Sequence, residues 1–476
     1  MNIEYDNYIA KAFPENPYEI AFLEQYRHDT SSVAPGARYM KAHQLYMKTK
    51  GKAGWDGRAF SMDKNGSFLA GLVPSLIDKA AYRKLSCNSV YVGPPRNPGN
   101  FHPVTVQLRP YQQEGVNALL NNVHPVLGWN PRGILRVATG GGKTEMAIAL
   151  YQSLPLPTIF FVHLKQLLTQ TVARFMNYGI VTGVIGDGTV NINPHINIAT
   201  IQTVTSLLKK GDTNIRSMLQ NTEQVFFDEA HGIAATLAKG NTLVEMSKHL
   251  NKAFIRWGLT ATPFMRDQYS NMLLEGVTGP VIYDIGSKKL IELGYLTPPE
   301  ITMIKVPKVP CPGTWPEAYD SGIVLNSARN ALIMDEIKKA PKPCLIMCTQ
   351  VAHAKIIERN APSFRIRMGY LDGPTPVNER NTKIMELIAG NLDAIVCTTI
   401  FNAGVDIPEL RSLVLAAGGK SKVSHLQKIG RGLRRAKDKP TVKVIDFYDT
   451  SAKVLERHSM ARMKIWKDEG FTVDVK

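Results

Sequence analysis

The sequence predicts an α/β protein with two doubly wound parallel-sheet domains. Short apolar runs rich in β-branched residues alternate with helix-length segments, which favours parallel strands that are buried on both faces. This alternation occurs in residues 133–261 and again in residues 344–448, so we expect the same architecture twice. With 476 residues, 44% of them hydrophobic, the chain is long enough for two or three domains with separate cores.

Each half contains five predicted strands. Those of the first half are residues 133–138, 158–164, 196–201, 224–230 and 254–261, and those of the second half are residues 344–349, 364–371, 393–399, 412–417 and 442–448. A stretch rich in Pro, Gly and Asn at residues 92–104 predicts a linker. We therefore expect a small basic N-terminal domain at 1–95, sheet domains at 101–295 and 300–452, and a basic C-terminal helix or tail at 453–476.

Charge indicates an anionic partner. The formal net charge is +17, and fifteen Lys and Arg residues stand against four Asp and Glu residues between Arg411 and Lys467. A second basic stretch, from Arg38 to Arg58, has six positive charges, one negative charge and interleaved aromatic residues. Nucleic acid is the expected partner, and a merely soluble basic protein is the alternative.

Other compositional signals are negative. No run of 18 apolar residues occurs, and the first residues lack a basic stretch followed by an apolar one, so we expect a cytoplasmic protein without a membrane partner. The five cysteines form no paired CxxC set, and Cys344 and Cys348 lie on an apolar run typical of a core strand. We expect neither a zinc site nor disulfide bonds.

A glycine-rich turn follows the first predicted strand and precedes a helical segment. Its residues are Thr139, Gly140, Gly141, Gly142, Lys143 and Thr144. Such a turn lets backbone N–H groups surround phosphate oxygens, while the lysine reaches the β- and γ-phosphates and the following threonine ligates Mg²⁺. Val137 stands where the strict phosphate-loop pattern has its first glycine. The strand–loop–helix context still favours an ATP site over a chance match.

Two adjacent acids end another predicted strand. Asp228 and Glu229 follow an apolar run, where carboxylates are rarely left unpaired. Mg²⁺ would explain them, with Asp228 holding the ion through water and Glu229 orienting and deprotonating the attacking water. A solvated strand end is the alternative for this pair alone. Together with the phosphate loop, the acids predict a nucleotide hydrolase.

Six motifs occur in an order that resembles superfamily 2 helicases. They are LRPYQ (108–112), VATGGGKT (137–144), DEAH (228–231), GLTATP (258–263), GVDIP (404–408) and QKIGRGLR (427–434). The resemblance implies tandem RecA-like domains, ATP and Mg²⁺ as cofactors, and adenine recognition by Gln112 near Arg109. It also implies nucleotide contacts by Gly404 and Asp406, and coupling of hydrolysis to movement by His231, Thr260 and Thr262.

The basic segment from Gln427 to Arg435 has two interpretations, a nucleic-acid grip or a source of catalytic cations. The phosphate loop and both acids lie in the first sheet domain, where Lys143 is the one cationic group predicted to neutralise the transition state. Arg431 and Arg434, one turn apart, would supply further charge across the cleft as arginine fingers, with Gln427 beside them. We therefore predict a mainly catalytic role for this segment.

Nucleic-acid contacts are expected after several strands and in the N-terminal domain. Polar groups at helix N-termini contact phosphates without reading sequence, although ordinary capping is an equal alternative for each one. The candidates are Lys165, Gln170, Thr200, Gln202, Thr349 and Thr398 in the sheet domains, and Lys48, Lys50, Lys52 and Arg58 in the basic strip before them.

The N-terminal segment narrows the expected activity. Residues 54–80 are similar to the small domain that precedes the motor in phage branch-migration helicases, which implies an α+β fold for this part. No nuclease acid-acid-lysine set is found, which disfavours a restriction-subunit role. The sequence therefore predicts a monomeric ATP-dependent DNA helicase or translocase for forks and Holliday-type junctions, in recombination, repair or replication. An RNA-directed helicase and an ATP-gated annealing or clamp protein are the alternatives, and replication or recombination proteins are possible partners.

Overall fold

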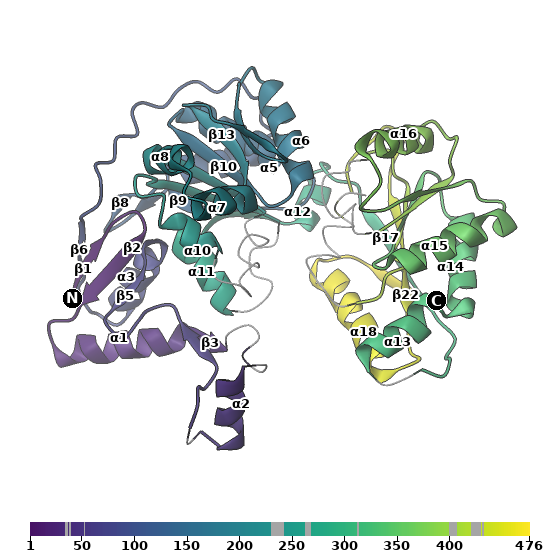
Figure 1. Cartoon of the computed structure of the whole chain (residues 1–476), viewed down its shortest axis with the longest axis horizontal. Coiled ribbons are helices and arrows are strands. Elements are labelled where there is room, and N and C mark those ends of the chain that lie inside the picture. The colour runs from purple at the N-terminus through teal and green to yellow at the C-terminus, as the bar shows by residue number, and fades with distance from the viewer. Residues whose placement is uncertain are drawn as a thin grey trace. The chain divides into compact units, whose positions relative to one another are not determined.

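The chain consists of two compact units (Figure 1). The computed structural model describes residues 1–33, 37, 40–51, 53–229, 242–261, 268–311, 314–398, 407–419, 430 and 433–476. The first unit contains Met1–Val137 and Gly142–Asp284, and the second contains Ala138–Gly141 and Ile285–Lys476. Each unit has a large sheet of its own.

A four-stranded sheet begins the first unit, in the strand order β5-β2-β1-β6. Its strands are β1 (Asn2–Tyr5), β2 (Ile9–Phe13), β5 (Ser67–Leu69) and β6 (Asn88–Tyr91). Helices α1 (Pro17–Asp29) and α3 (Val73–Tyr82) contribute Leu23, Leu76 and Ile77 to the core of this small domain. Asn16 caps α1, since its side chain accepts from the backbone N–H groups of the first turn.

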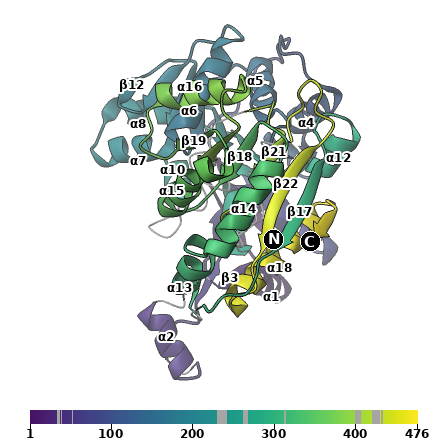
Figure 2. The ribbon, with the colours of Figure 1, turned by 90° about the vertical axis from the view of Figure 1, so that its right-hand side faces the viewer.

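Between α1 and α3 the chain extends as a short antiparallel ribbon that carries a helix. The ribbon pairs β3 (Ser31–Val33) with β4 (Arg58–Phe60), and the helix is α2 (Lys41–Lys48), which contains no buried residue. α2 stands away from the body of the first unit in both views (Figures 1 and 2). Residues 40–58 are called the arm below.

The main sheet of the first unit has the strand order β12-β11-β13-β10-β14-β15-β9-β16. The strands are β9 (Arg132–Val137), β10 (Thr158–Val162), β11 (Gly183–Gly186), β12 (Thr189–Asn191), β13 (Ile196–Thr200), β14 (Gln224–Asp228), β15 (Ile255–Thr260) and β16 (Val281–Ile285). The five central strands pair in parallel. A small hairpin of β7 (Val123–His124) and β8 (Gly128–Trp129) precedes them.

Helices pack on both faces of this sheet because its strands are apolar on both sides. They are α4 (Pro110–Leu120), α5 (Lys143–Ser153), α6 (Lys165–Met176), α7 (Ile201–Lys209), α8 (Thr213–Asn221), α10 (Thr242–Ser247) and α11 (Gln268–Thr278). Phe160 packs edge-on against Phe175 of α6. Its neighbour Phe161 belongs instead to the core with α7, α8, α10 and α11.

The N-terminal domain is docked on the main sheet domain within the same unit. Gly71, in the short helical turn η2 (Ala70–Leu72), lies so close to α11 that a Cβ atom there would overlap the Glu275 carbonyl oxygen. Arg132, buried at the start of β9, donates to the backbone carbonyl of Asn7. The two domains therefore pack closely against each other and are not joined by the linker alone.

The second unit contains a seven-stranded sheet in the order β19-β20-β18-β21-β22-β17-β23, whose adjacent strands all pair in parallel. Its strands are β17 (Pro299–Lys305), β18 (Cys344–Met347), β19 (Met368–Leu371), β20 (Ala394–Cys397), β21 (Ser412–Val414), β22 (Val442–Tyr448) and β23 (Val473–Val475). Its helices are α12 (Ser287–Glu292), α13 (Trp315–Tyr319), α14 (Ser327–Lys339), α15 (Val351–Asn360), α16 (Val377–Ile388) and α18 (Lys453–Asp468), with short turns η4 (Asp320–Val324) and η5 (Ala361–Phe364).

The C-terminal residues belong to this second sheet domain. β23 pairs with β17, and α18 buries Arg462, whose Nε donates to the Asp446 carboxylate on β22 at 2.9 Å. The same guanidinium donates to the Gly419 carbonyl at 3.0 Å. The basic tail therefore packs on the sheet through a buried ion pair.

The predicted α/β class with two parallel-sheet domains is confirmed. Among the helices in the described part of the chain, none combines the length and the apolar character needed to cross a bilayer.

Candidate active site

Predicted catalytic motifs lie at the carboxyl ends of neighbouring central strands in the first parallel sheet. β15 lies between β9, which leads into the phosphate loop, and β14, which ends at Asp228. Asp228 is paired with Leu259, and the next residue of β15, Thr260, is paired with Arg136 of β9. Because these strands are parallel, their carboxyl ends meet at the same edge. The buried Thr260 therefore lies between the phosphate loop and the acids.

The phosphate loop is a turn whose glycines could not readily be replaced by residues with side chains. Gly140 and Gly142 have φ values of 86° and 79°, in the left-handed region that favours glycine. A Cβ atom on Gly142 would overlap the side-chain amide of Gln112. Helix α5 begins directly after it, at Lys143, so the first N–H groups of the helix point toward the loop.

Gln112 is buried beside this loop and held by the start of α4. Its Oε1 accepts from the backbone N–H of Arg109 at 2.9 Å, which caps the helix. The Arg109 guanidinium lies 3.4 Å from the Tyr111 hydroxyl. The structure therefore places Gln112, one of the two residues predicted to read adenine, beside the phosphate loop.

The two acids and the lysine meet at the end of β14. Lys143 Nζ lies 3.6 Å from Glu229 Oε1, and both side chains are largely buried. Burial and the neighbouring Glu229 carboxylate raise the pKa of Asp228 to about 7, while Lys143 opposes the rise. Glu229 itself has a φ of 45°, and its N–H donates to Asp228 Oδ1 at 3.0 Å. A non-glycine residue in that conformation is strained, which is typical of functional sites.

These residues fit a nucleotide with a divalent cation. A buried carboxylate whose charge is disfavoured is stabilised in its ionised form when a cation binds beside it. The glycine turn and the start of α5 provide backbone donors for phosphate oxygens. Lys143, Thr144, Asp228 and Glu229 are the side chains that could hold Mg²⁺-ATP, with Thr144 half-buried in the first turn of α5.

His163 is a neighbour of this site that the sequence reasoning did not single out. It follows β10 directly, at the same edge of the sheet. Burial lowers the pKa of His163, and the Glu229 carboxylate opposes that effect, so the two side chains interact. Its carbonyl accepts from Gln202 Nε2 at 3.1 Å. A histidine at the end of an apolar strand was the available signal.

Of the residues predicted to contact phosphates in the first unit, three are exposed and one is buried. Lys165, at the start of α6, is exposed and pairs with Asp187 at 2.8 Å, and Gln170 is exposed on the same helix. Gln202 is exposed on α7. Thr200 is buried, and its hydroxyl donates to Thr203 at 2.7 Å, so this side chain is engaged inside the fold.

In the second unit, Thr349 is exposed and Thr398 is buried. Arg434 lies in an isolated bridge with Leu296. Its carbonyl accepts from the buried Lys439, whose Nζ also donates to the Pro408 carbonyl, both at 2.9 Å.

Lys439 was missed because a lysine in a basic segment indicates a solvated charge. The structure shows that it ties the end of the GVDIP motif to the end of the QKIGRGLR motif. Seven predicted site residues lie outside the described part of the chain. They are Lys52, His231, Thr262, Gly404, Asp406, Gln427 and Arg431.

The basic strip of the N-terminal domain lies on the arm. Lys48 and Lys50 are exposed. Arg58 is half-buried at the base of the arm, where its guanidinium donates to Ser31 Oγ at 2.8 Å. Arg58 therefore has a structural contact inside the ribbon.

Two family descriptions match the chain. "Type III restriction enzyme, res subunit" matches residues 105–265, and "Helicase conserved C-terminal domain" matches residues 328–436. The first match covers the phosphate loop and both acids, and the second covers the segment from Gln427 to Arg434. Each match lies within one of the two parallel-sheet domains, and the second leaves out β17, β22 and β23.

Relatives with curated names are similar over most of this chain. The ATP-dependent DNA helicase uvsW of Enterobacteria phage T4 is 26% identical over 73% of this chain and 74% of its own length. The helicase 22 of Sulfolobus islandicus filamentous virus is 26% identical over 71% of this chain and 64% of its own length. A protein named as a DNA 3'-5' helicase from Halobacterium salinarum is 26% identical over 77% of this chain and 58% of its own length. The chain thus spans less than two thirds of two of these relatives.

Solved structures share the fold. An HsdR-subunit fragment of a type I restriction enzyme from Vibrio vulnificus has a TM-score of 0.55 at 18% identity, over 78% of this chain and 69% of its own. The Saccharomyces cerevisiae protein Dbp5, bound to RNA and ADP BeF3, has a TM-score of 0.53 at 16% identity, over 78% of this chain and 94% of its own. At these identities the likeness concerns the tandem RecA-like architecture alone.

Proposed function

Because the chain belongs to the ATP-dependent helicases of superfamily 2, we propose that it is a DNA helicase or translocase that acts on branched DNA such as forks and Holliday-type junctions. The observation that carries the ATPase part is the group of Lys143, Asp228 and Glu229 at one sheet edge. DNA as the substrate is supported by the basic arm and by the phage T4 relative, which is named as a DNA helicase. The preference for branches rests on the similarity of residues 54–80 to the small domain of phage branch-migration helicases.

Hydrolysis follows from the chemistry of these side chains. Lys143 and the N–H groups at the start of α5 bind the phosphates. Asp228 would hold Mg²⁺, and the ion would neutralise negative charge on the phosphates. Glu229 orients the attacking water and accepts its proton. The strained backbone of Glu229 sets the direction of that carboxylate.

The second unit supplies the remaining positive charge in this proposal. Arg431 and Arg434 act as arginine fingers, with Gln427, Gly404 and Asp406 at the same nucleotide. Since these residues belong to a different unit from Lys143, hydrolysis requires the two units to close. Closure and opening then move the units along one DNA strand through phosphate contacts. Exposed residues such as Lys165, Gln170 and Gln202 contact the backbone.

The first test compares Lys143→Ala with the wild type. ATPase and strand displacement are measured on a four-way DNA junction, linear duplex, single-stranded DNA and RNA. We expect the junction to stimulate the wild-type ATPase most, and the variant to lose ATPase and displacement on every substrate, because the phosphates lose their cation. Lys210→Ala, which removes an exposed lysine at the end of α7, is the matched control and should behave as the wild type.

Each other outcome contradicts a defined part of the proposal. Displacement that survives Lys143→Ala would refute the ATP-driven mechanism. Equal stimulation by linear duplex would refute the preference for branches, and stimulation by RNA alone would make the substrate RNA.

A further inference from the structure

His163 lies between Glu229 and a segment that is predicted to contact nucleic acid. Strand β10 ends one residue before His163, and it pairs in parallel with β14 on one side and with β13 on the other. Phe161 is opposite Phe227 in this pairing, and His163 and Glu229 follow two residues later on their respective strands. His163 therefore lies at the same level of the sheet edge as Glu229, with the end of β13 on its other side.

The neighbour on the β14 side acts on His163 through its charge. The Glu229 carboxylate interacts electrostatically with the imidazole of His163. Nδ1 of this imidazole is buried, and it has no hydrogen-bond partner among the residues that the structure describes. A buried polar atom without a partner is unfavourable, because it has lost its hydrogen bond to water. A rotation of the ring that lets Nδ1–H donate to the Glu229 carboxylate would remove this cost.

The neighbour on the β13 side holds the backbone of His163. Gln202, in the first turn of α7, donates from Nε2 to the His163 carbonyl oxygen at 3.1 Å. The Gln202 side chain is exposed, so a nucleic-acid phosphate can reach it. Hydrogen bonds to a charged acceptor are roughly twice as strong as those to a neutral one. A phosphate that accepts from Gln202 would therefore draw the amide away from the His163 carbonyl.

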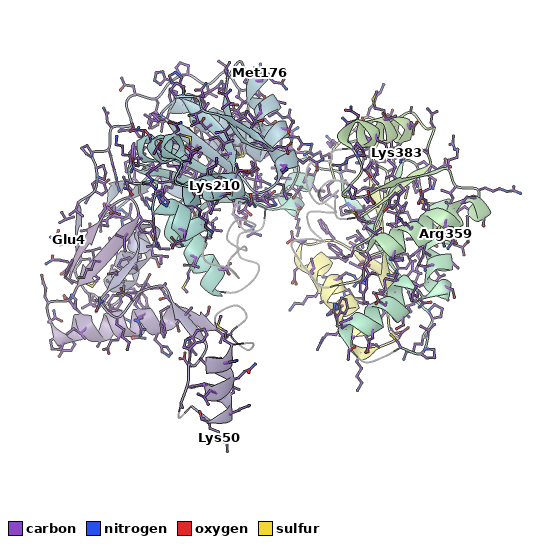
Figure 3. The ribbon with its side chains drawn as sticks, in the orientation of Figure 1. Glu4, Lys50, Met176, Lys210, Arg359 and Lys383 are labelled. Carbon is purple, nitrogen blue, oxygen red and sulfur yellow. The ribbon has the colours of Figure 1, made fainter. Side chains whose placement is uncertain are left out.

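The segment that follows His163 offers a second contact for the same strand of nucleic acid. Helix α6 begins at Lys165, two residues after His163, and ends at Met176, whereas α7 ends beside Lys210 (Figure 3 labels Met176 and Lys210). The Lys165 side chain is exposed, as that of Gln202 is. A strand whose phosphates contact both side chains acts on His163 through two separate connections.

We propose that His163 is the positioning residue through which bound nucleic acid activates Glu229. Without nucleic acid, Gln202 holds the His163 carbonyl and the ring does not donate to Glu229. When phosphates engage Gln202 and Lys165, the ring turns and donates from Nδ1 to the Glu229 carboxylate, which then stays directed at the attacking water. A fixed orientation of the base increases the fraction of bound ATP that is ready to react. This inference rests on the proposed function, since it explains how the DNA substrate controls the ATPase.

The test compares ATP hydrolysis with and without nucleic acid, using the full chain. The kcat and the KM for ATP are measured without DNA, with a single-stranded thymidine oligonucleotide and with a four-way junction, and fluorescence anisotropy gives the affinity for the same DNA. His163→Ala removes the donor, whereas His163→Asn places an amide N–H close to the position of Nδ1–H. His195→Ala is the matched control, because His195 is exposed and precedes β13 at the opposite edge of the sheet.

We expect His163→Ala to reduce the ratio of the kcat with DNA to the kcat without DNA by about tenfold. The KM for ATP and the affinity for DNA should stay near their wild-type values, because the imidazole contacts neither ligand. His163→Asn should recover most of the ratio, since its amide can donate to the carboxylate. His195→Ala should match the wild type in every measurement.

Gln202→Ala tests the other connection of His163. Without the hydrogen bond to its carbonyl, the residue is free to turn, so the kcat without DNA should rise by about threefold or more. The double variant His163→Ala/Gln202→Ala should lack this rise, because both substitutions act on one path. A histidine that only supported the fold would produce no gain of activity in Gln202→Ala.

The outcomes separate this inference from the proposed function. If DNA stimulates the wild type and His163→Ala keeps the wild-type ratio, the role of His163 is refuted. If His163→Ala and His163→Asn lose stimulation together with their affinity for DNA, the histidine supports the DNA-binding surface and its action on Glu229 is refuted. If no nucleic acid stimulates the wild type, the proposed function is refuted, and this inference with it.

Discussion

Gly142 combines a backbone constraint with a steric one. Its φ of 79° lies in the left-handed region, and a side chain there would overlap the Gln112 amide. We expect Gly142→Ala to weaken ATP binding by about tenfold or more. The added methyl group would overlap the Gln112 amide, so the turn would have to shift away from the conformation that surrounds the phosphates. Titration with a fluorescent ATP analogue measures the change.

Gly188→Ala is the matched control for this substitution. Gly188 has a φ of 80° with open space around it, so it has the same backbone strain without the overlap. Both variants should lose on the order of 1 kcal/mol of stability. Equal ATP affinity in the two variants would contradict a specific role for Gly142.

His353 makes the second unit sensitive to acid. Its Nε2 lies 2.9 Å from Asn330 Oδ1, and burial, with a smaller effect of Arg329, lowers its pKa from 6.5 to about 3. Below pH 6.5 the unfolded state binds a proton that the folded state excludes, so the free energy of unfolding falls as pH decreases toward 3. At pH 5 the loss from this group is about 2 kcal/mol.

His353→Gln should remove this part of the pH dependence, since glutamine stays neutral. Hydrogen exchange of α15 at pH 7.5 and pH 5 measures the stability of the second unit. The control His28→Gln, at an exposed position on α1, should retain the wild-type response. An equal loss of protection in His353→Gln and the wild type would show that other groups cause the acid sensitivity.

The contact between η2 and α11 joins the N-terminal domain to the motor. A Cβ atom on Gly71 would meet the backbone carbonyls of Glu275 and Gly276, which cannot rotate away as a side chain can. We expect Gly71→Ala to destabilise the first unit by about 1–3 kcal/mol and to raise hydrogen exchange in α11. Gly286→Ala, where the added atom meets open space, should leave both unchanged. Unaltered protection of α11 in Gly71→Ala would show that the interface is loose.

The main strands were predictable because a buried strand is a continuous apolar run. β10, β14 and β18 lie within their predicted ranges. The prediction for 364–371 began too early, since Phe364 ends a helical turn and Arg365 has a φ of 56°. Edge strands such as β12 and β23 have exposed residues and short lengths, so their sequences carry no strong periodic signal.

The two units divide the proposed catalytic residues between them. Lys143, Asp228 and Glu229 belong to the first, and Arg434 belongs to the second. We expect Arg434→Ala to reduce DNA-stimulated ATPase by on the order of 10³-fold while ATP affinity stays near the wild-type value, because an arginine finger acts on the transition state. Arg435→Ala, at the exposed neighbouring position, should keep the ATPase. An equal loss of ATPase activity in both variants would indicate that the substitutions disturb the local structure instead.

The interface with α11 also decides how the N-terminal domain can be tested. Removal of residues 1–95 would expose α11 and leave Arg132 without the Asn7 carbonyl. A loss of activity in that deletion would therefore mix instability with loss of DNA contact. Point variants on the arm avoid this problem, because Lys48 and Lys50 are exposed.

Local patterns already identified the two parallel sheets, the phosphate loop and the acids at the end of β14. Each of these depends on neighbours in the sequence: a glycine turn between a strand and a helix, or a carboxylate pair after an apolar run. Other interactions depend on the tertiary fold: the ion pair of Arg462 with Asp446, the hydrogen bonds of Lys439 to two motifs, and the electrostatic effect of Glu229 on His163. They join residues that are distant in the sequence or that local patterns present as solvated charges. Two basic residues of the segment 411–467, Lys439 and Arg462, are buried. A charge can be buried when a partner offsets its desolvation, and the tertiary fold decides which partner that is.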